Sequence, residues 1–219
     1  MKRLNKVALA LATAGLLASG VAQAELFDRG GGLIYDDVLN ITWLSDANYA
    51  ATQFAATGGT QGDLDGLMNW SAANTWASSL NISRFAGESL TDWRLPTALN
   101  QNGSGPCLGY NCSNSEMGHM SYNNLYDAGG YGISFTNLQS YVYWSGTTDS
   151  PGSVEYAWYY DFSSDRQDYY GTNGVFYAWA VRPGNVALVP EPEAYAMLLA
   201  GLGLLGVVAK RRRRSFGAS

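Results

Sequence analysis

The chain has 219 residues and a formal charge of −5, but its charges are distributed unevenly. Eight of the 13 lysines and arginines lie within the first six residues or after residue 209. Residues 25–188 therefore contain five basic residues, all arginines, against 16 acidic ones, and carry a formal charge of −11. So acidic a surface repels phosphate backbones, which argues against a nucleic acid partner.

Residues 1–24 have the pattern of a secretory signal peptide. A basic start precedes a mainly apolar run at 7–21, and Ala22 and Ala24 form the small-x-small pattern of a cleavage site. An uncleaved membrane anchor fits less well, because the run is short and ends at a good cleavage site. We therefore expect signal peptidase to cleave after Ala24, so that the exported chain begins at Glu25.

Residues 25–188 have the length of one domain. Their first part predicts a hairpin of two short strands at 33–35 and 41–44. Residues 57–66 are rich in Gly, Thr and Asp, which indicates an exposed loop. Beyond this loop, apolar residues recur at the spacing of one helical face, namely Leu67, Trp70, Ala73, Ala77 and Leu80. We therefore expect a helix within 67–80, and a second, short helix at 116–125.

The last third of the domain predicts strands at 141–145, 156–162 and 175–181. Large apolar side chains alternate along the second and third of these, and Asn173-Gly174 is a strong turn signal. We expect 156–162 and 175–181 to pair as antiparallel strands joined through 163–174. Their sheet should bury Trp158 and Trp179.

The chain has two cysteines, Cys107 and Cys112, in a segment rich in Gly, Asn and Ser. After export they meet an oxidising compartment, which predicts a disulfide between them. So short a loop contributes roughly 2 kcal/mol in the chain-entropy account. A metal site is the alternative, but two thiols alone make a poor zinc site, and the sequence has no second cysteine pair or histidine cluster.

His119 is the only histidine, so a Ser-His-Asp arrangement would have to include it. No nucleophile motif stands nearby. Glu116 and His119 are three residues apart and would share a helical face, which would suit a metal or an acid–base pair. A hydrogen-bonded structural histidine is the favoured interpretation. We therefore predict no catalytic site and no enzyme activity.

Two groups of acidic residues could hold calcium through loop oxygens. One is Asp63 with Asp65, and the other is Asp161 with Asp165 and Asp168. Acidic turns are usually solvated, however, and we predict no cofactor.

Arg94 and Arg182 each lie beside a core tryptophan or a strand. With so few cations among so many acids, each arginine should find a partner easily. We expect both to support the fold by pairing with a buried acid such as Asp92 or Asp161.

The end of the chain, residues 189–219, has three parts in a fixed order. Pro190-Glu191-Pro192 precedes an uncharged, mainly apolar run at 194–209, and the basic cluster Lys210-Arg211-Arg212-Arg213-Arg214 follows. As a helix the run would be roughly 24 Å long, short of the roughly 30 Å hydrocarbon core. We therefore expect 194–209 to be a transmembrane helix that spans only with local thinning of the bilayer or snorkelling of flanking residues. The basic cluster stays on the cytoplasmic side, so everything before Pro190 should lie outside the cytoplasm. On physical grounds alone an ordinary C-terminal anchor is the alternative.

This order of parts resembles the PEP-CTERM sorting signal, also named the ice-binding-protein C-terminal domain. In bacteria with exosortase systems, the resemblance implies export, retention in the inner membrane and processing by the exosortase. The sorting residues are then Pro190, Glu191 and Pro192 together with the basic cluster at 210–214. The final location would be the cell surface or the extracellular matrix.

The domain itself resembles the Lcl C-terminal domain family. The motifs that carry the resemblance are Gly32-Leu33-Ile34-Tyr35-Asp36, Trp93-Arg94-Leu95-Pro96-Thr97, Tyr143-Trp144-Ser145, Ala157-Trp158 and Ala180-Val181-Arg182-Pro183. The resemblance implies an α+β fold similar to C-type lectins and formylglycine-generating enzymes, with a twisted, mainly antiparallel sheet, two helices and long loops. It implies no settled activity, because a fold does not carry function.

Two functional hypotheses follow. The first is a non-enzymatic exported protein that binds glycan, such as an extracellular polysaccharide, or another extracellular ligand through a lectin-like domain. The second is a secreted enzyme of the formylglycine-generating or hydrolase type on the same fold. The first is favoured, because the sequence lacks a pairing of base and nucleophile. The Glu-Pro-Asn and Trp-Asn-Asp signatures of calcium-dependent lectins are also absent.

The tail generates a prediction about processing. Prolines keep residues 190–192 out of a helix, so this segment should present extended backbone to the exosortase. Glu191→Ala should leave membrane insertion intact but block processing, whereas removal of 211–214 should let the apolar run slip through the membrane. Cell fractionation and the C-terminal mass of the mature protein test this in a host with an exosortase. Wild-type protein recovered from the inner membrane with Ser219 still attached would show that the tail is a plain anchor.

Overall fold

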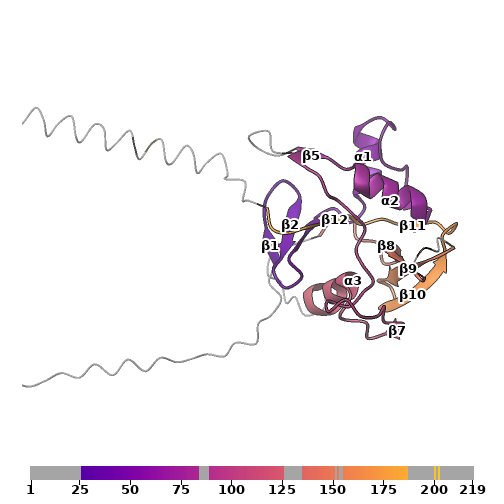
Figure 1. The fold of residues 1–219 in the computed structure, drawn as a ribbon. Helices are drawn as coiled ribbons and strands as arrows, with labels where there is room; N and C mark the ends of the chain where they lie inside the picture. Colours follow the sequence, from indigo (N-terminus) through magenta and orange to yellow (C-terminus); the bar gives the residue numbers. More distant parts are fainter. Residues whose placement is uncertain are drawn as a thin grey trace, which may run out of the picture.

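The computed structural model describes residues 26–83, 89–125, 135–150, 152 and 155–186, together with residues 200 and 202 (Figure 1). The predicted signal peptide, with Ala22 and Ala24, lies outside the described residues. So do the sorting residues at 190–192 and 210–214 and, apart from residues 200 and 202, the predicted span at 194–209. Among the described residues, no helix has both the length and the apolar character needed to cross a membrane.

One antiparallel sheet of four strands and one mixed sheet of six strands form the body of the domain. In the four-stranded sheet the strand order is β1-β2-β3-β12, and all neighbours are antiparallel. In the six-stranded sheet the order is β4-β11-β8-β9-β10-β7, with β11 and β8 the parallel pair. A further pair, β5 with β6, stands apart. The strands are β1 (Leu26–Asp28), β2 (Leu33–Asp36), β3 (Ile41–Leu44), β4 (Leu67–Met68), β5 (Ile82–Ser83), β6 (Ser89–Leu90), β7 (Gly109–Tyr110), β8 (Val142–Thr148), β9 (Tyr156–Asp161), β10 (Arg166–Gly171), β11 (Phe176–Tyr177) and β12 (Val181–Pro183).

The helices are α1 (Tyr49–Ala56), α2 (Trp70–Ser79) and α3 (Glu116–His119), and α3 continues into a π-helical turn, η2 (Met120–Leu125). The helix expected within 67–80 is α2, which begins after Asn69 accepts a hydrogen bond from the amide of Ala72. The short helix expected at 116–125 is also confirmed, with π geometry in its second half. The mixed α+β class is therefore confirmed, while the likeness to C-type lectins stays a prediction.

The predicted pairing of 156–162 with 175–181 is wrong. Strand β9 pairs with β8 on one side and with β10 on the other, and β10 lies inside the segment expected to be a connection. The stretch 175–181 is divided between the two sheets as β11 and β12. The division follows from Trp179, whose indole nitrogen donates to the Leu44 carbonyl oxygen (2.7 Å). Its ring packs on Trp43 at 4.6 Å between centroids, which draws the chain from one sheet to the other.

Aromatic side chains fill the core. Trp43, Trp144, Trp179, Tyr143 and Tyr160 are among the largest fully buried side chains. The predicted burial of Trp158 and Trp179 is confirmed, with exposed fractions of 7% and 0%. Alternation along β9 therefore does report its buried face, because Trp158 and Tyr160 lie inside while Tyr156 at the strand end is exposed.

The buried position of Trp158 sets a stability prediction. Trp158→Ala should lower the free energy of unfolding by about 3–5 kcal/mol, because truncating a core aromatic loses its burial and leaves a cavity. Urea titration followed by circular dichroism measures the change. Tyr156→Ala, in the same strand but 46% exposed, is the control. Equal midpoints for the two variants would mean that Trp158 contributes no more to stability than a surface ring.

Candidate functional site

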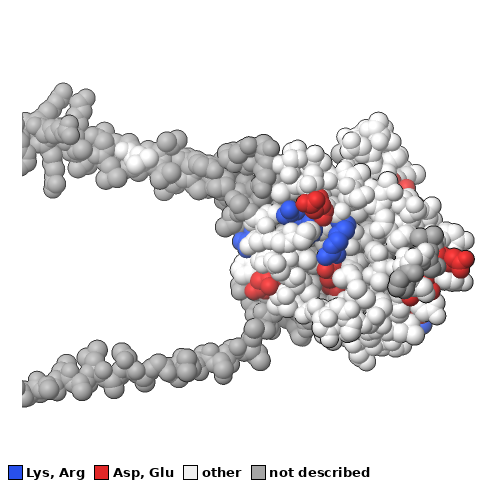
Figure 2. Space-filling model, viewed as in Figure 1, with Lys and Arg blue, Asp and Glu red and all other residues white. Residues whose placement is uncertain are grey.

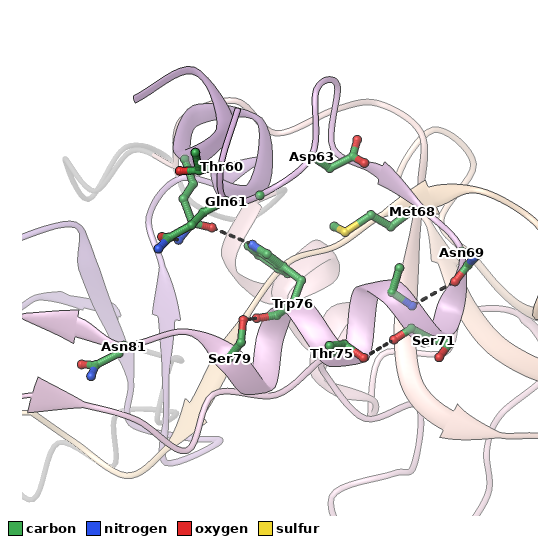
Figure 3. A pocket seen from close by; sticks show the side chains of 13 residues that line it. Thr60, Gln61, Asp63, Met68, Asn69, Ser71, Thr75, Trp76, Ser79 and Asn81 are labelled. Carbon is green, nitrogen blue, oxygen red and sulfur yellow. Dashed lines mark hydrogen bonds between the residues drawn. The ribbon is translucent and has the colours of Figure 1, made fainter. Parts of the chain in front are cut away.

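A polar groove of about 800 Å³ lies between α1, the loop at 57–66 and α2 (Figure 3). Amide and hydroxyl side chains dominate its lining, and Asp63 is the one charged residue among the lining residues. The surface over α1 and α2 is nearly free of charge on the face shown in Figure 2. The groove is therefore suited to a neutral ligand with many hydroxyl groups.

The loop at 57–66 is held against α1 by hydrogen bonds. The hydroxyl of Thr57 donates to the Gln53 carbonyl oxygen (2.8 Å) and accepts from the amide of Gln61 (3.1 Å). The amide of Asp63 donates to the Ala50 carbonyl oxygen (3.1 Å). Between them Gly62 has a positive φ of 81°, and a Cβ there would overlap the Ala50 carbonyl oxygen. Only glycine lets the loop approach the helix so closely, and this approach forms one wall of the groove.

A chain of hydrogen bonds fixes the amide groups in the groove. The indole nitrogen of Trp76 donates to Gln53 Oε1 (3.0 Å), and Gln53 Nε2 donates to Gln61 Oε1 (3.1 Å). Because an indole N–H can only donate, it sets the orientation of both amides in turn. The bond from Gln53 uses the side-chain oxygen of the exposed Gln61, so its amino group can act as a donor in the groove.

The carboxylate of Asp63 stands two residues from Gln61 and adds an acceptor. Its Oδ1 accepts from the amides of Asp65 (3.3 Å) and Gly66 (3.0 Å), so the side chain is oriented by its own turn. On the opposite wall, the hydroxyl of Thr75 donates to the Ser71 carbonyl oxygen (2.9 Å). That bond uses the hydroxyl proton and leaves oxygen lone pairs on the groove side. The groove thus offers a donor at Gln61 and acceptors at Asp63 and Thr75.

The predicted disulfide is present. Cys107 and Cys112 are bonded, with their Cα atoms 5.6 Å apart. The loop that they close contains β7, which pairs with the start of β10. The loop closed by the disulfide therefore supplies the edge strand of the six-stranded sheet, β7, next to β10.

Glu116 and His119 do not form a joint site. Both carboxylate oxygens of Glu116 accept from Arg94, each at 2.7 Å, and Glu116 Oε2 also accepts from the amide of Thr97 (2.8 Å). Arg94 thus pairs with a buried acid, as expected, but this acid is Glu116 and not Asp92 or Asp161. The side chain of Arg182 donates to the backbone carbonyl oxygen of Thr91 (3.3 Å) rather than to either of the acids expected for it.

His119 is buried beside the β2–β3 hairpin. Its Nε2 lies 3.8 Å from Asp36 Oδ2, and its Nδ1 lies 3.4 Å from the side-chain amide of Gln101. Burial lowers the pKa of His119, and the negative charges of Asp36 and Asp37 oppose that shift without cancelling it. Burial raises the pKa of Asp36, against hydrogen bonds from the amides of Leu39 and Val38.

The acidic residues considered for calcium are engaged separately. Asp65 accepts from the amide of Leu67, Asp165 accepts from Ser121 and Tyr160, and Asp168 pairs with Arg166. For Asp161, burial would raise the pKa, but hydrogen bonds from Ser163 and Ser164 outweigh it and leave the pKa lowered. In the described part of the chain, no three His, Cys, Asp or Glu residues lie together as metal ligands.

The sequence indicated the loop of the groove but not its walls. The Gly, Thr and Asp content of 57–66 predicted an exposed loop, whereas α1 and the Trp76-Gln53-Gln61 chain were missed. The indole of Trp76 and the amide of Gln53 are 23 residues apart, so no local pattern could reveal their contact. Gly62, which stands beside acidic and amide residues, is the one local signal in the sequence that the loop lies close to another backbone segment.

A family model described as the Lcl C-terminal domain matches residues 32–182, and one described as the PEP-CTERM protein-sorting motif matches residues 188–214. Both resemblances inferred from the sequence are thereby confirmed. No curated protein and no solved structure matches the chain. The first match contains the groove, the disulfide and the Arg94–Glu116 pair. The second contains the residues expected to direct sorting, Pro190, Glu191, Pro192 and the basic cluster at 210–214.

The environment of His119 sets a prediction about pH. Because the unfolded chain binds a proton at His119 near pH 6.5 and the folded chain does so only at lower pH, stability should be lost as pH falls below 6.5. Asp36 has the opposite effect on stability, because its pKa is raised in the folded chain. As pH falls toward the ordinary pKa of 3.8, the folded chain binds a proton at Asp36 before the unfolded chain does, and this adds stability. As the sole histidine, His119 gives an unambiguous imidazole signal by NMR. Its midpoint should lie below 6.5.

Asp36→Asn should lower this midpoint further, because it removes the nearest negative charge. Asp149→Asn, which replaces an exposed acid, is the matched control and should leave the midpoint unchanged. A wild-type midpoint at or above 6.5 would contradict the interpretation that burial affects the pKa of His119 more than the two neighbouring acids do.

Proposed function

The chain belongs to the Lcl C-terminal domain family, and we propose that it is a non-enzymatic, exported protein that binds a neutral glycan in the groove between α1 and α2. The PEP-CTERM motif implies export, processing by an exosortase and sorting to the cell surface or extracellular space. Signal peptidase cleavage after Ala24 and a transient stay in the inner membrane belong to the same proposal. The extracellular matrix is then the place where the groove meets its ligand.

The observation that carries the proposal is the lining of the groove. A sugar hydroxyl both donates and accepts, so it is best bound where donors and acceptors alternate. The amino group of Gln61 and the carboxylate of Asp63 offer this pairing, and the uncharged remainder of the lining has no cation to attract an acidic polymer. A volume of about 800 Å³ would hold more than one sugar residue.

The chemistry of the chain also supports a binding role over an enzymatic one. An enzyme of the formylglycine-generating type works through a reactive cysteine, and the two cysteines of this chain are bonded to each other. His119, the sole histidine, is buried beside Asp36 and does not line the groove. Binding is proposed to be independent of calcium, since Asp63 and Asp65 already accept backbone hydrogen bonds.

Two variants of the same loop test the groove. Asp63→Asn removes the charge that faces the groove, and Asn can still accept the hydrogen bonds of the turn. Asp65→Asn makes the same change at an acid that does not line the groove. A hydrogen bond to a charged group contributes about 1 kcal/mol more than one to a neutral group, so Asp63→Asn should weaken glycan binding by about fivefold. Asp65→Asn should bind like the wild type.

The measurement is a glycan array with the purified exported protein, followed by affinity electrophoresis in gels that contain neutral polysaccharides, with and without EDTA. Retention should survive EDTA and should weaken with Asp63→Asn or Gln61→Ala. Failure to bind any glycan would overturn the proposal, and turnover of a sugar without retention would favour the enzyme hypothesis. Equal losses for Asp63→Asn and Asp65→Asn would place the binding site elsewhere.

A further inference from the structure

A cluster of three rings lies on the face of the six-stranded sheet that α2 covers in part. The indole of Trp70 donates to the Ser145 carbonyl oxygen (2.8 Å), which places the start of α2 over β8. Trp144, the register partner of Tyr159, donates to the Met68 carbonyl oxygen (2.8 Å) on the same face. Beyond the edge of the helix this face presents Tyr159, Tyr170 and Phe176, which we name the aromatic platform.

The rings of the platform support one another. Phe176 is central, with its ring centroid 5.4 Å from that of Tyr159, 5.6 Å from that of Tyr170 and 4.4 Å from that of the buried Trp144. Tyr170 is 55% exposed, and Tyr159 and Phe176 are half-buried. A Cβ on Gly174 would come within 2.8 Å of the Tyr170 ring, so the turn before β11 lies directly against that ring. The platform is therefore a supported, partly exposed surface.

Polar groups border the rings on β10. Arg166 and Asp168 form an ion pair, and the Arg166 side chain is 44% exposed. Register places Asp168 opposite Tyr159, and Tyr170 two residues further along the same strand. Burial raises the pKa of Tyr159, and the charge of Asp168 adds to that shift, which reflects how close the carboxylate lies to the ring. The rings of the platform, on which a sugar can stack, thus lie beside two charged side chains that can form hydrogen bonds with sugar hydroxyls.

The platform and the groove are connected through the sheet. Met68 lines the groove, and its register partner in the neighbouring strand is Phe176. The four-stranded sheet, which holds the first described strand and β12, lies on the other side of the domain from β9 and β10 (Figure 1). Strands β9 and β10, which bear Tyr159 and Tyr170, therefore lie on the other side of the domain from β12.

We propose that the aromatic platform is a second subsite, on which a neutral polysaccharide chain held in the groove continues across the sheet. The inference rests on the proposed function and specifies its ligand as a long polymer. The faces of pyranose rings stack on aromatic side chains, while their hydroxyls can bind the Arg166–Asp168 pair. Asp161 and Asp168 outnumber Arg166 on this face, and that balance disfavours an acidic polymer.

Two adjacent tyrosines provide a matched test. Tyr170→Ala removes a ring from the platform, and Tyr169→Ala removes a ring of similar exposure, 45% against 55%, from the opposite face of the same strand. Losing one stacked ring should weaken binding of long chains by about three- to tenfold. Tyr170→Phe, which keeps the ring, should bind long chains as well as the wild type does.

The assay compares a soluble neutral polysaccharide with its own oligosaccharides of two to eight residues. The panel contains hydroxyethylcellulose, galactomannan and dextran, with alginate as the acidic polymer. Affinity electrophoresis measures the polymers and calorimetry measures the oligosaccharides. Tyr170→Ala should lose affinity for the polymer and for the longest oligosaccharides alone, whereas Asp63→Asn should lose affinity at every length. Alginate should not retard the protein.

The outcomes separate the two proposals. If no polymer retards the wild type, both the glycan proposal and the second subsite are overturned. If the wild type binds but Tyr170→Ala and Tyr169→Ala behave alike, the groove stands and the second subsite is overturned. Affinity that does not rise with chain length would likewise overturn it. Circular dichroism of each variant checks that the fold is retained.

Discussion

The bidentate pair between Arg94 and Glu116 joins the parts of this domain that are distant in sequence. Both contacts are 2.7 Å, and Glu116 also accepts from the amide of Thr97. Burial would lower the pKa of Arg94, but Glu116 outweighs it and leaves the pKa raised. The Arg94 side chain is 41% exposed, so water screens part of the attraction. The planar guanidinium of Arg94 and the planar carboxylate of Glu116 nevertheless form two hydrogen bonds side by side, and these fix the start of α3 against the segment at 94–97.

The same segment connects the two sheets. The backbone of Arg94 exchanges two hydrogen bonds with Val181, in the four-stranded sheet, at 2.8 and 2.9 Å. Two residues later the carbonyl oxygen of Pro96 accepts from Gly146, in the six-stranded sheet (2.8 Å). Gly146 follows Ser145, whose carbonyl oxygen holds the indole of Trp70 at the start of α2. The position of the groove therefore depends on a connection that begins at Arg94.

The parts of the fold that could be predicted are those that local pattern determines. Alternation along 156–162 reports a buried face, helical spacing reports α2, and two cysteines in an exported chain report a disulfide. The parts that could not be predicted depend on distant contacts. Alternation continues through 175–181, yet the chain changes sheets there because Trp179 is buried against Trp43. In β10, by contrast, the sequence Arg-Gln-Asp-Tyr-Tyr-Gly does not indicate a strand. Its one fully buried residue is polar: Gln167, whose side-chain nitrogen donates to the distant carbonyl oxygens of Ala98 and Cys107.

The candidate site follows the same division. The exposed loop at 57–66 could be recognised from composition. Its position as a wall of the groove could not, because the hydrogen bonds from Trp76 to Gln53 and from Gln53 to Gln61 join two helices and the loop. The pairing of Arg94 with a buried acid could be expected from the excess of acids, but which acid it pairs with depends on the position of α3. An acid that starts a helix and also accepts a backbone amide, as Glu116 does, competes better than Asp92, which lies nearer in sequence.

Charge links the domain to the class of ligand proposed for it. A region with a formal charge of −11 and no lysine repels acidic polymers that come within roughly 10 Å, the distance beyond which salt in the medium screens the repulsion. Neutral polysaccharides are not repelled, so selection against acidic chains needs no contact within the groove. Hydrogen bonds exchanged for those of water give small net free energies, so one subsite alone would bind weakly. A polymer that meets a groove and a ring surface on one domain, and many domains on one cell surface, would be retained through the sum of these weak contacts. Sorting of the chain to that surface by its tail is what would make so modest a groove effective.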